Sequence, residues 1–438
     1  MLLIRKGRIL KGKHWMRVNI VINESGKIVD IYKSDNVKQF WLAKVNNVYN
    51  AKEFLLLPGI IDMHVHFREP GFEWKEDFLT GSKSAIAGGV TIIADMPNND
   101  PKIDSFEMFK RKFDLIKDKS YCDFLLYVGL PKNSMELEKF LKVKNSFPLP
   151  AGVKVYLYNA EEEDILIQED LPRDFLYVIH AEDHRYLTPI SDCESYSSFE
   201  KSRPREAEIS AVKKIIEIAR KKQLRFHIAH LSSYEALIEI IKAKREGIKI
   251  TAEVTPHHLI LNKELGEKLK GVAKCYPPLR TELDRRMLWR GVLSGYIDAI
   301  ASDHAPHAAG EKLVNLCKAS PGINGVQLLL PLIYTLIKKT HVRDLEPIIN
   351  ALTRNPAKIL GLKNRGKIKI GFYADIIIFN PRKEWKVTSE VLFSKSSITP
   401  YEGMRVKGWV KATFLRGKLV YEDMTFLKKI GTYATILQ

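Results

Sequence analysis

The sequence predicts an α/β protein built on a (β/α)8 TIM barrel, with a small composite β-sandwich domain formed by the two ends of the chain. Three observations predict this architecture. Eight apolar runs alternate with helical patterns along the middle of the chain, strand-rich segments lie at both ends, and 438 residues of which 45% are hydrophobic suffice for a large core. We expect residues 1–57 and 361–438 to form the β domain and residues 58–360 to form the barrel.

The terminal segments carry strand patterns separated by turn signals. LLIRKGRIL, HWMRVNIVIN and KIVDIYKS occupy the first part of the chain, with ESGK at 24–27 between the last two. ADIIIFNP and MRVKGWVKATFLRGKLVYED follow near the other end, where Arg416-Gly417 is the expected hairpin turn. Two such ends flanking one body favour a single β domain assembled from both.

The central body contains short apolar runs that match buried parallel strands. The expected strands are 59–66, 90–97, 123–130, 152–158, 175–181, 224–231, 248–255 and 297–303. Residues 76–89, 204–222 and 233–247 have apolar positions at three- and four-residue spacing, which is typical of helices. A doubly wound open sheet is the alternative, but no GxGxxG follows the first strand.

Composition excludes several classes of protein. The longest apolar stretches, LLLPGII and QLLLPLIY, are much shorter than the ~20 residues of a membrane span. Charges interrupt every apolar run of the N-terminus, which argues against a signal peptide. Four cysteines lie far apart without a CxxC, so we expect neither a disulfide framework nor a zinc ribbon, and we expect a cytoplasmic protein.

The net charge of +18 has two interpretations. A basic protein can bind nucleic acid. However, the lysines are spread along the chain, in segments such as FKRKFDLIKDK, and spread charge is typical of a solvated surface. We therefore expect no nucleic-acid partner and no membrane partner, while an anionic small substrate would profit from the positive field.

Histidines and one aspartate lie at the carboxyl ends of four predicted strands, where barrel active sites are found. His64 and His66 end the first strand, and as residues i and i+2 they point to the same face. His180, His230 and Asp303 end the fifth, sixth and eighth strands. Imidazole nitrogen and carboxylate oxygen are ligands for Zn²⁺, and five such groups exceed the needs of one tetrahedral ion. The pattern predicts a two-metal site.

Four further residues carry weaker signals. Lys154 lies within the apolar strand GVKVYLY, where it is either a snorkelling or salt-bridged lysine or one with a depressed pKa that takes up CO₂ as a carbamate. His257 and His258 follow the seventh strand, and we expect them to be structural or to support the ligands. His307 ends ASDHAPH and is a candidate for the barrel mouth.

Several motifs occur together and in order over nearly the whole chain. They are IDMHVHFREPG, ADMPNNDP, GVKVYLY, IHAED, HIAHLSS, EVTPHHL, PPLR, ASDHAPH and TPYEG. With these motifs the chain resembles the cyclic amidohydrolases, and among them it is most similar to the dihydroorotase family.

The resemblance implies a metal centre and a set of substrate contacts. It implies two Zn²⁺ ions per chain, bridged by an N6-carboxylated Lys154. The implied ligands are His64, His66 and Asp303 for one ion and His180 and His230 for the other. Arg68, Asn98 and His307 match the family's substrate contacts, with Arg68 holding a carboxylate, and Asp303 would act as general base and then general acid.

The activity that the resemblance implies is the reversible cyclisation of N-carbamoyl-L-aspartate to L-dihydroorotate in pyrimidine (UMP) biosynthesis. The resemblance is also compatible with a homodimer and with association of the protein with aspartate transcarbamoylase. Allantoinase or a hydantoinase of the dihydropyrimidinase type is the alternative, since Tyr276, the run KCYPPLR and the loop YNAEEED depart from the dihydroorotase pattern. A catalytically inactive barrel that serves as a binding partner is disfavoured because all six ligand positions are filled.

Overall fold

The computed structural model describes residues 1–34 and 38–436. Its central element is a series of parallel strands, and each predicted run of the body contains at least one of them. The series comprises β6 (Ile60–Val65), β7 (Val90–Asp95), β8 (Asp123–Leu126), β9 (Val128–Gly129), β10 (Val153–Tyr156), β11 (Leu176–His180), β12 (Arg225–Ile228), β13 (Ile250–Val254) and β14 (Ala299–Ile300).

The parallel strands pair in the order in which they occur in the chain. One sheet holds β6, β7 and β8, and a second runs from β9 to β14. β8 and β9 are separated only by Tyr127, so they continue one another along the chain. A parallel bridge between Val65 and His304, with a 2.8 Å hydrogen bond from the His66 N–H to the His304 carbonyl, links the first strand to the segment after the last.

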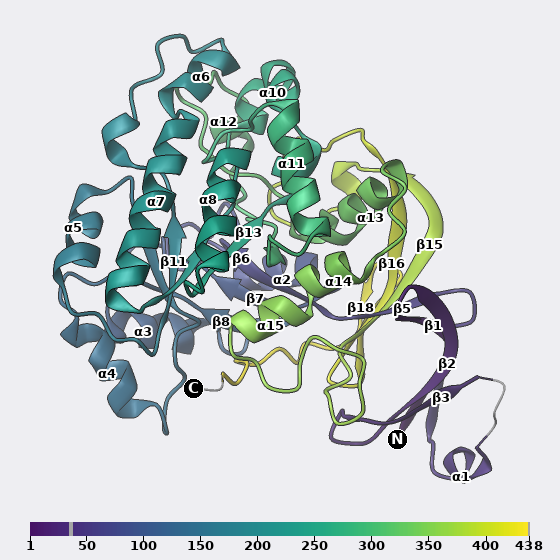
Figure 1. The fold of residues 1–438 in the computed structure, drawn as a ribbon. Coiled ribbons are helices and arrows are strands. Elements are labelled where there is room, and N and C mark those ends of the chain that lie inside the picture. Colours follow the sequence, from purple (N-terminus) through teal and green to yellow (C-terminus); the bar gives the residue numbers. More distant parts are fainter. Residues whose placement is uncertain (35–37, 437–438) are drawn as a thin grey trace.

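Helices lie between successive strands and cover the outside of the series (Figure 1). Those that follow a strand of the series are α2 (Phe78–Ala87), α3 (Phe106–Ile116), α4 (Met135–Val143), α5 (Ala160–Gln168), α6 (Tyr196–Ser202), α7 (Arg205–Lys222), α8 (Tyr234–Arg245), α9 (Pro256–Ile260), α10 (Lys263–Leu269), α11 (Glu282–Leu293), α12 (Ala309–Lys312), α13 (Leu329–Lys339), α14 (Glu346–Leu352) and α15 (Arg354–Ile359). The short helix α1 (Gln39–Leu42) precedes the series and lies apart from it (Figure 1). The predicted helices 76–89, 204–222 and 233–247 correspond to α2, α7 and α8.

Local sequence explains where these helices start and what they bury. The Asp77 carboxylate accepts from the Thr80 N–H at the start of α2, and Thr281 and Asp284 form a capping box at α11. The apolar faces of the helices pack on the strands. Ile215 of α7 and Ile240 of α8, both fully buried, belong to one core cluster with Ile228 of β12. This packing fixes the strand ends that carry the polar residues.

The two ends of the chain form one sheet on the flank of the parallel strands (Figure 1). Its strands are β1 (Leu2–Lys11), β2 (His14–Ile22), β3 (Ile28–Lys33), β4 (Asn47–Asn50), β5 (Leu55–Pro58), β15 (Ile376–Lys386), β16 (Arg405–Leu415), β17 (Lys418–Glu422) and β18 (Thr425–Phe426). The antiparallel pair β5–β15 joins the N-terminal and C-terminal parts. Arg416 and Gly417 form the predicted turn between β16 and β17. Both ends of the chain therefore contribute strands to one nine-stranded sheet.

Two of the cysteines form a bond that their spacing in the sequence does not indicate. A disulfide joins Cys193 and Cys317, whose Cα atoms lie 5.0 Å apart although 124 residues separate them in the chain. Cys122 and Cys275 are free and buried. The sequence predicts no disulfide framework, and a single bond is not one, but the bond itself was not foreseen because the spacing of cysteines in the sequence says nothing about loops that the fold brings together. Here Cys193, before α6, meets Cys317 of the segment that follows α12.

Reducing this disulfide is expected to lower the thermal stability of the protein. A bond that closes so long a loop typically contributes about 2–4 kcal/mol, largely by restricting the unfolded chain. Differential scanning calorimetry with and without a phosphine reductant measures the effect. Replacing both Cys193 and Cys317 with serine should lower Tm similarly and remove the response to reductant, and an unchanged Tm of the reduced wild-type protein would contradict the expectation.

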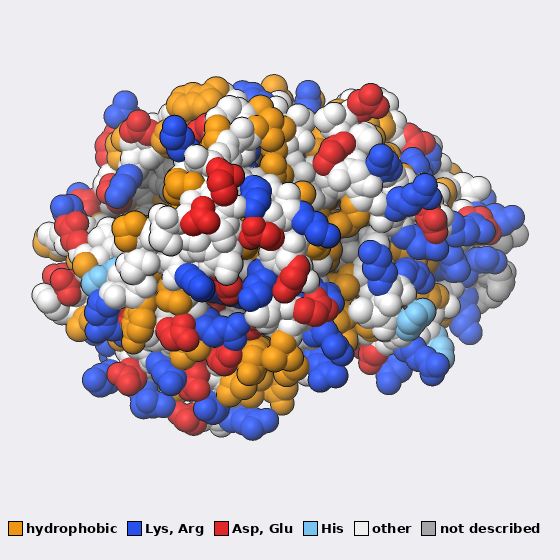
Figure 2. Space-filling model, turned by 90° about the horizontal axis from the view of Figure 1, so that it is seen from above, with side chains coloured by type: hydrophobic (Ala, Val, Ile, Leu, Met, Phe, Trp, Pro, Cys, Tyr) orange, Lys and Arg blue, Asp and Glu red, His pale blue; other side chains and the backbone are white. Residues whose placement is uncertain are grey.

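Charge is mixed over most of the visible surface. Figure 2 shows Lys and Arg side chains interspersed with Asp and Glu, and they are densest toward the end of the molecule that carries β1, β2 and β3. Among the described residues, no helix combines the length and the apolar character needed to cross a bilayer. The picture agrees with the solvated surface that the sequence predicts.

Candidate functional site

The residues predicted to bind metal meet at the carboxyl ends of the parallel strands. His64 and His180 lie at the carboxyl ends of β6 and β11. His230 and Asp303 follow β12 and β14. All of these side chains, together with Lys154 of β10, line one pocket of about 120 Å³. His66 lines the same pocket, so the fold brings together six residues from five separate segments of the chain.

His64 and His66 present the same ring nitrogen to Asp303. The Nε2 atoms lie 3.4 Å and 3.1 Å from Asp303 Oδ1. On the other side of each ring, Nδ1 of His64 lies 2.5 Å from Glu253 Oε1, and Nδ1 of His66 lies 2.6 Å from Asn98 Oδ1. Because these oxygens accept hydrogen bonds, they favour the tautomer with the proton on Nδ1. In that tautomer the Nε2 lone pair faces the pocket.

His180 and His230 face each other across the pocket. His180 Nδ1 lies 3.0 Å from His230 Nε2, while His180 Nε2 lies 2.6 Å from a Glu182 carboxylate oxygen. Glu182 therefore favours a proton on Nε2 of His180 and leaves the Nδ1 lone pair directed at His230. Burial lowers the pKa of His230 well below its usual value, so its imidazole is neutral.

This arrangement of lone pairs suits cations. Nitrogen and oxygen lone pairs at about 3 Å repel each other unless a proton or a cation lies between them. His64, His66 and His180 each have the outer ring nitrogen tied to an oxygen acceptor, which is the usual support for a metal-binding histidine. His64, His66 and Asp303 also form a group whose ligand atoms lie within 4.8 Å of one another. The residues present therefore fit a metal centre.

Lys154 is buried beside these histidines, with 1% of its surface exposed. In the described part of the chain its Nζ has no hydrogen-bond partner, and no ion pair includes it. Burial lowers its pKa to about 8, which raises the fraction of neutral, nucleophilic amine. The salt-bridged lysine considered from the sequence is not observed among the described residues, and an unpartnered amine here suits conversion to an anionic carbamate.

Arg68 lies at the same pocket and is free of carboxylate partners. It is 8% exposed, its Nε donates to the Pro306 carbonyl at 3.3 Å, and its Nη2 lies 3.0 Å from His307 Nε2. No ion pair among the described residues includes Arg68, since Glu69 pairs with Lys119 and Asp77 pairs with Lys395. A buried guanidinium without an anion is suited to a carboxylate ligand.

The other two predicted substrate contacts have different positions. Asn98 lines the pocket, but its amide oxygen is engaged by His66. His307 does not line the pocket directly and instead supports Arg68, while its Nε2 also lies 3.0 Å from the Pro321 carbonyl. Tyr156, Tyr158 and Tyr276 complete the wall. Tyr276, one of the departures seen in the sequence, is thus part of the site.

Sequence reasoning missed the residues that hold the histidines. Glu253 of β13 is fully buried and lies against both His64 and His227, which a carboxylate inside the apolar run ITAEV could have signalled. Glu182 follows His180 by two residues. The Arg203 guanidinium donates to the Glu182 carboxylate from Nε, at 3.1 Å to each oxygen, and from Nη2 at 2.7 Å.

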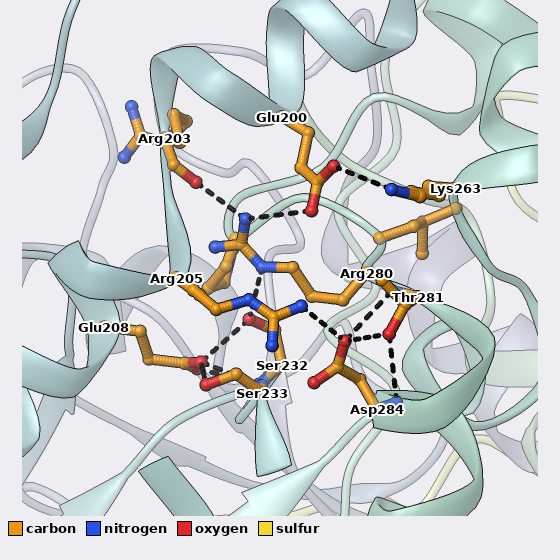
Figure 3. Close-up of polar contacts among 12 residues, drawn as sticks. Glu200, Arg203, Arg205, Glu208, Ser232, Ser233, Lys263, Arg280, Thr281 and Asp284 are labelled. Carbon is orange, nitrogen blue, oxygen red and sulfur yellow. Dashed lines mark hydrogen bonds and ion pairs between the residues drawn. The ribbon is translucent and has the colours of Figure 1, made fainter. Parts of the chain in front are cut away.

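Arg203 connects the pocket wall to His180, one of the candidate metal ligands, through Glu182. Its guanidinium carbon lies 3.7 Å from the centroid of the Tyr276 ring, in addition to its bonds to Glu182. Figure 3 shows the next layer, in which Arg280 donates to the carbonyl oxygen of Arg203 at 2.8 Å and lies 3.8 Å from Glu200. The network fixes Arg203 through both its main chain and its side chain.

Comparisons with known proteins identify related sequences and folds. A model of the amidohydrolase family matches residues 55–420. The dihydroorotase of Listeria welshimeri is 36% identical over 432 residues, covering 97% of this chain and 99% of that protein. The dihydroorotase of Elusimicrobium minutum is 34% identical over 431 residues, covering 93% and 94%. That of Methanosarcina acetivorans is 34% identical over 431 residues, covering 94% and 90%.

Solved structures show the same fold. The L-hydantoinase (dihydropyrimidinase) of Arthrobacter aurescens superposes with a TM-score of 0.88 at 23% identity, covering 99% of each chain. The dihydropyrimidinase of Brevibacillus agri gives a TM-score of 0.85 at 23% identity, with 99% of each chain covered. The family match over most of the chain and the full-length curated relatives lead to one conclusion: the chain belongs to the amidohydrolase family, in which these curated relatives are dihydroorotases.

Proposed function

We propose that the protein is a dihydroorotase, which interconverts N-carbamoyl-L-aspartate and L-dihydroorotate in pyrimidine biosynthesis. One observation carries the choice of substrate: Arg68 is buried at the pocket without a carboxylate partner among the described residues. Dihydroorotate carries a ring carboxylate, whereas hydantoin, dihydrouracil and allantoin are neutral. The names of the curated relatives support the same choice.

The proposal includes two zinc ions. His64, His66 and Asp303 would hold one ion, His180 and His230 the other, and a carboxylated Lys154 would bridge them. The support is the convergence of histidine lone pairs and the unpartnered Lys154 amine. When bound, such ions lower the pKa of water and polarise a carbonyl group.

Asp303 and Arg68 have different roles in the proposed reaction. Although burial alone would raise the pKa of Asp303, His64 and His66 hold it well below its usual range, so the carboxylate is ionised and can act as a base. Asp303 takes a proton from the attacking water and returns it to the leaving ring nitrogen. Arg68 grips the substrate carboxylate, and the tyrosines limit the space around the ring.

The finer features of fold and location belong to the same proposal. We take the parallel strands as one closed eight-stranded barrel, supported by the Val65–His304 bridge and the continuity of β8 with β9. The terminal sheet would fold over its own apolar cluster as a sandwich, supported by the packing of Ile20, Leu56 and Ile378 in one cluster. Domain boundaries at 57/58 and 360/361, a cytoplasmic location, a homodimer and association with aspartate transcarbamoylase remain predictions.

A substrate panel tests the function. Purified protein is supplied with zinc and bicarbonate and assayed with dihydroorotate, carbamoyl aspartate, allantoin, hydantoin and dihydrouracil. We expect turnover of the first two and little of the neutral substrates. Preference for allantoin or hydantoin would overturn the dihydroorotase assignment and leave family membership intact.

Replacing Arg68 with methionine is expected to lower kcat/KM for dihydroorotate about 10- to 200-fold. The factor corresponds to the loss of a charge-assisted hydrogen bond worth roughly 1.5–3 kcal/mol. Arg68→Lys should restore only part of the loss, because an ammonium group cannot form two parallel bonds to a carboxylate. Steady-state kinetics with dihydroorotate measure both variants, and unchanged kinetics of Arg68→Met would remove the basis for the substrate choice.

Replacing Arg203 with methionine is expected to weaken metal binding by about tenfold. Without its bonds to Arg203, the Glu182 carboxylate is no longer held in the position that orients His180. Loss of a residue that supports a metal ligand typically lowers metal affinity about 10- to 100-fold. Competition with a chelator measures the affinity. Arg205→Met is the matched control, because Arg205 lies two residues from Arg203 but pairs with Glu235 and with Asp284 (Figure 3). Arg205 does not line the pocket. Equal affinities of the two variants would contradict the expectation.

A further inference from the structure

A second group of potential metal ligands lies outside the site described above. It consists of His257 and His258 of α9 and the free thiol of Cys275, whose ligand atoms lie within 4.8 Å of one another. All three are buried, with exposures of 1%, 3% and 1%. None of them is a member of the group His64, His66 and Asp303, so the second group has its own ligands.

His257 has no polar partner within the described ranges. Both Nδ1 and Nε2 are buried and lack a hydrogen bond. A buried imidazole with neither nitrogen bonded loses its hydration without compensation, which costs free energy. One ligand atom each of His257, His258 and Cys275 lies within 4.8 Å of the others, so a cation bound among them would satisfy a His257 nitrogen.

His258 and Cys275 are directed at one oxygen atom. His258 Nε2 lies 3.2 Å from the Pro277 carbonyl, and Cys275 Sγ lies 3.3 Å from the same carbonyl. On the far side of the ring, His258 Nδ1 lies 2.8 Å from Thr255 Oγ1, which orients the imidazole. A cation bound to Nε2 and Sγ would displace the Sγ proton, while the ring proton of His258 would lie on Nδ1, where Thr255 Oγ1 can accept it.

We propose that His257, His258 and Cys275 form a separate site for a single thiophilic or borderline metal ion, of the class of Zn²⁺, Co²⁺ or Cu⁺. Imidazole with thiolate is the donor set that these ions prefer over Mg²⁺ or Ca²⁺. On binding, the Cys275 thiol releases its proton and Sγ forms the bond to the metal. The site is adjacent to the pocket, since Tyr276 follows Cys275 in the chain and lines that pocket. The assignment does not depend on the proposed dihydroorotase activity.

Cobalt spectroscopy tests the site because sulfur ligands give a distinct signal. Metal-free protein with its disulfide intact is titrated with Co²⁺ in the absence of thiol reductants, so that Cys122 and Cys275 are the only free thiols. We expect a near-ultraviolet thiolate-to-cobalt charge-transfer band in the wild-type protein. None of the six ligands proposed for the zinc centre contains sulfur, so that centre cannot produce this band.

Matched variants assign the band. Cys275→Ala should lose it together with one equivalent of bound metal, and His257→Ala should shift its midpoint to higher Co²⁺ concentration. Cys122→Ala is the control, since Cys122 is equally buried and bonds only within its own loop. Absence of the band in the wild-type protein, or its loss in Cys122→Ala but not in Cys275→Ala, would overturn the proposal. If Cys275→Ala does not fold, Cys275→Ser and His257→Gln supply the same comparison.

Discussion

Replacing Lys154 with alanine is expected to remove most of the turnover and much of the bound metal. Lys154 is 1% exposed, has no polar partner in the described chain, and lies in the pocket with the candidate ligands. If its carbamate bridges two ions, alanine leaves both with one ligand fewer and leaves their mutual repulsion less screened. Metal analysis of protein purified without chelators should give about two equivalents of the pocket metals for wild type and clearly less for the variant.

Chemical rescue distinguishes a lost bridge from a damaged fold. Short carboxylic acids added with the metal should restore part of the activity of Lys154→Ala by standing in for the carbamate. Thermal unfolding shows whether the variant is intact, and Lys154→Gln, which keeps a polar side chain but cannot form a carbamate, should fail in the same way. A folded Lys154→Ala variant with wild-type turnover would show that this lysine has only a structural role.

Replacing Asp303 with asparagine is expected to lower kcat by about 10²-fold or more, the usual scale of general acid–base catalysis. The asparagine keeps an oxygen next to His64 and His66 but cannot accept and return a proton. The metal content should fall much less than the turnover. This difference would distinguish loss of the general base from loss of metal binding. Single-turnover kinetics with dihydroorotate, with metal analysis of the same sample, measure both.

Asp298→Asn is the matched control for this variant. Asp298 precedes the same strand, β14, and accepts hydrogen bonds from Lys244 and from the Ala252 N–H at the opposite end from the pocket. Its replacement should affect stability and leave kcat within a small factor of wild type. Similar losses of kcat in both variants would mean that Asp303 acts by supporting the fold, and the proposed proton transfer would then be wrong.

The sequence could predict the candidate ligands because their position follows from strand periodicity. His64, His66, His180 and Asp303 all occur where an apolar run stops, and parallel strands bring such positions to one end. The contacts behind the ligands could not be predicted in this way. Whether Asn98 faces a substrate or His66 depends on side-chain rotamers, and the meeting of Cys193 with Cys317 depends on two irregular segments. Neither leaves a periodic pattern in the chain.

The pairing of β5 with β15 also has a consequence for how the protein is made. Leu57 hydrogen-bonds in register with Ile377, more than three hundred residues later. Translation proceeds at about 5–20 residues per second, so the N-terminal strands wait on the order of 15–60 s for their partner to be synthesised. During that interval the edge of β5 is an unpaired strand on the nascent chain, open to chaperones and to other growing chains. The central body therefore emerges from the ribosome before the strands that complete the flanking sheet have been synthesised.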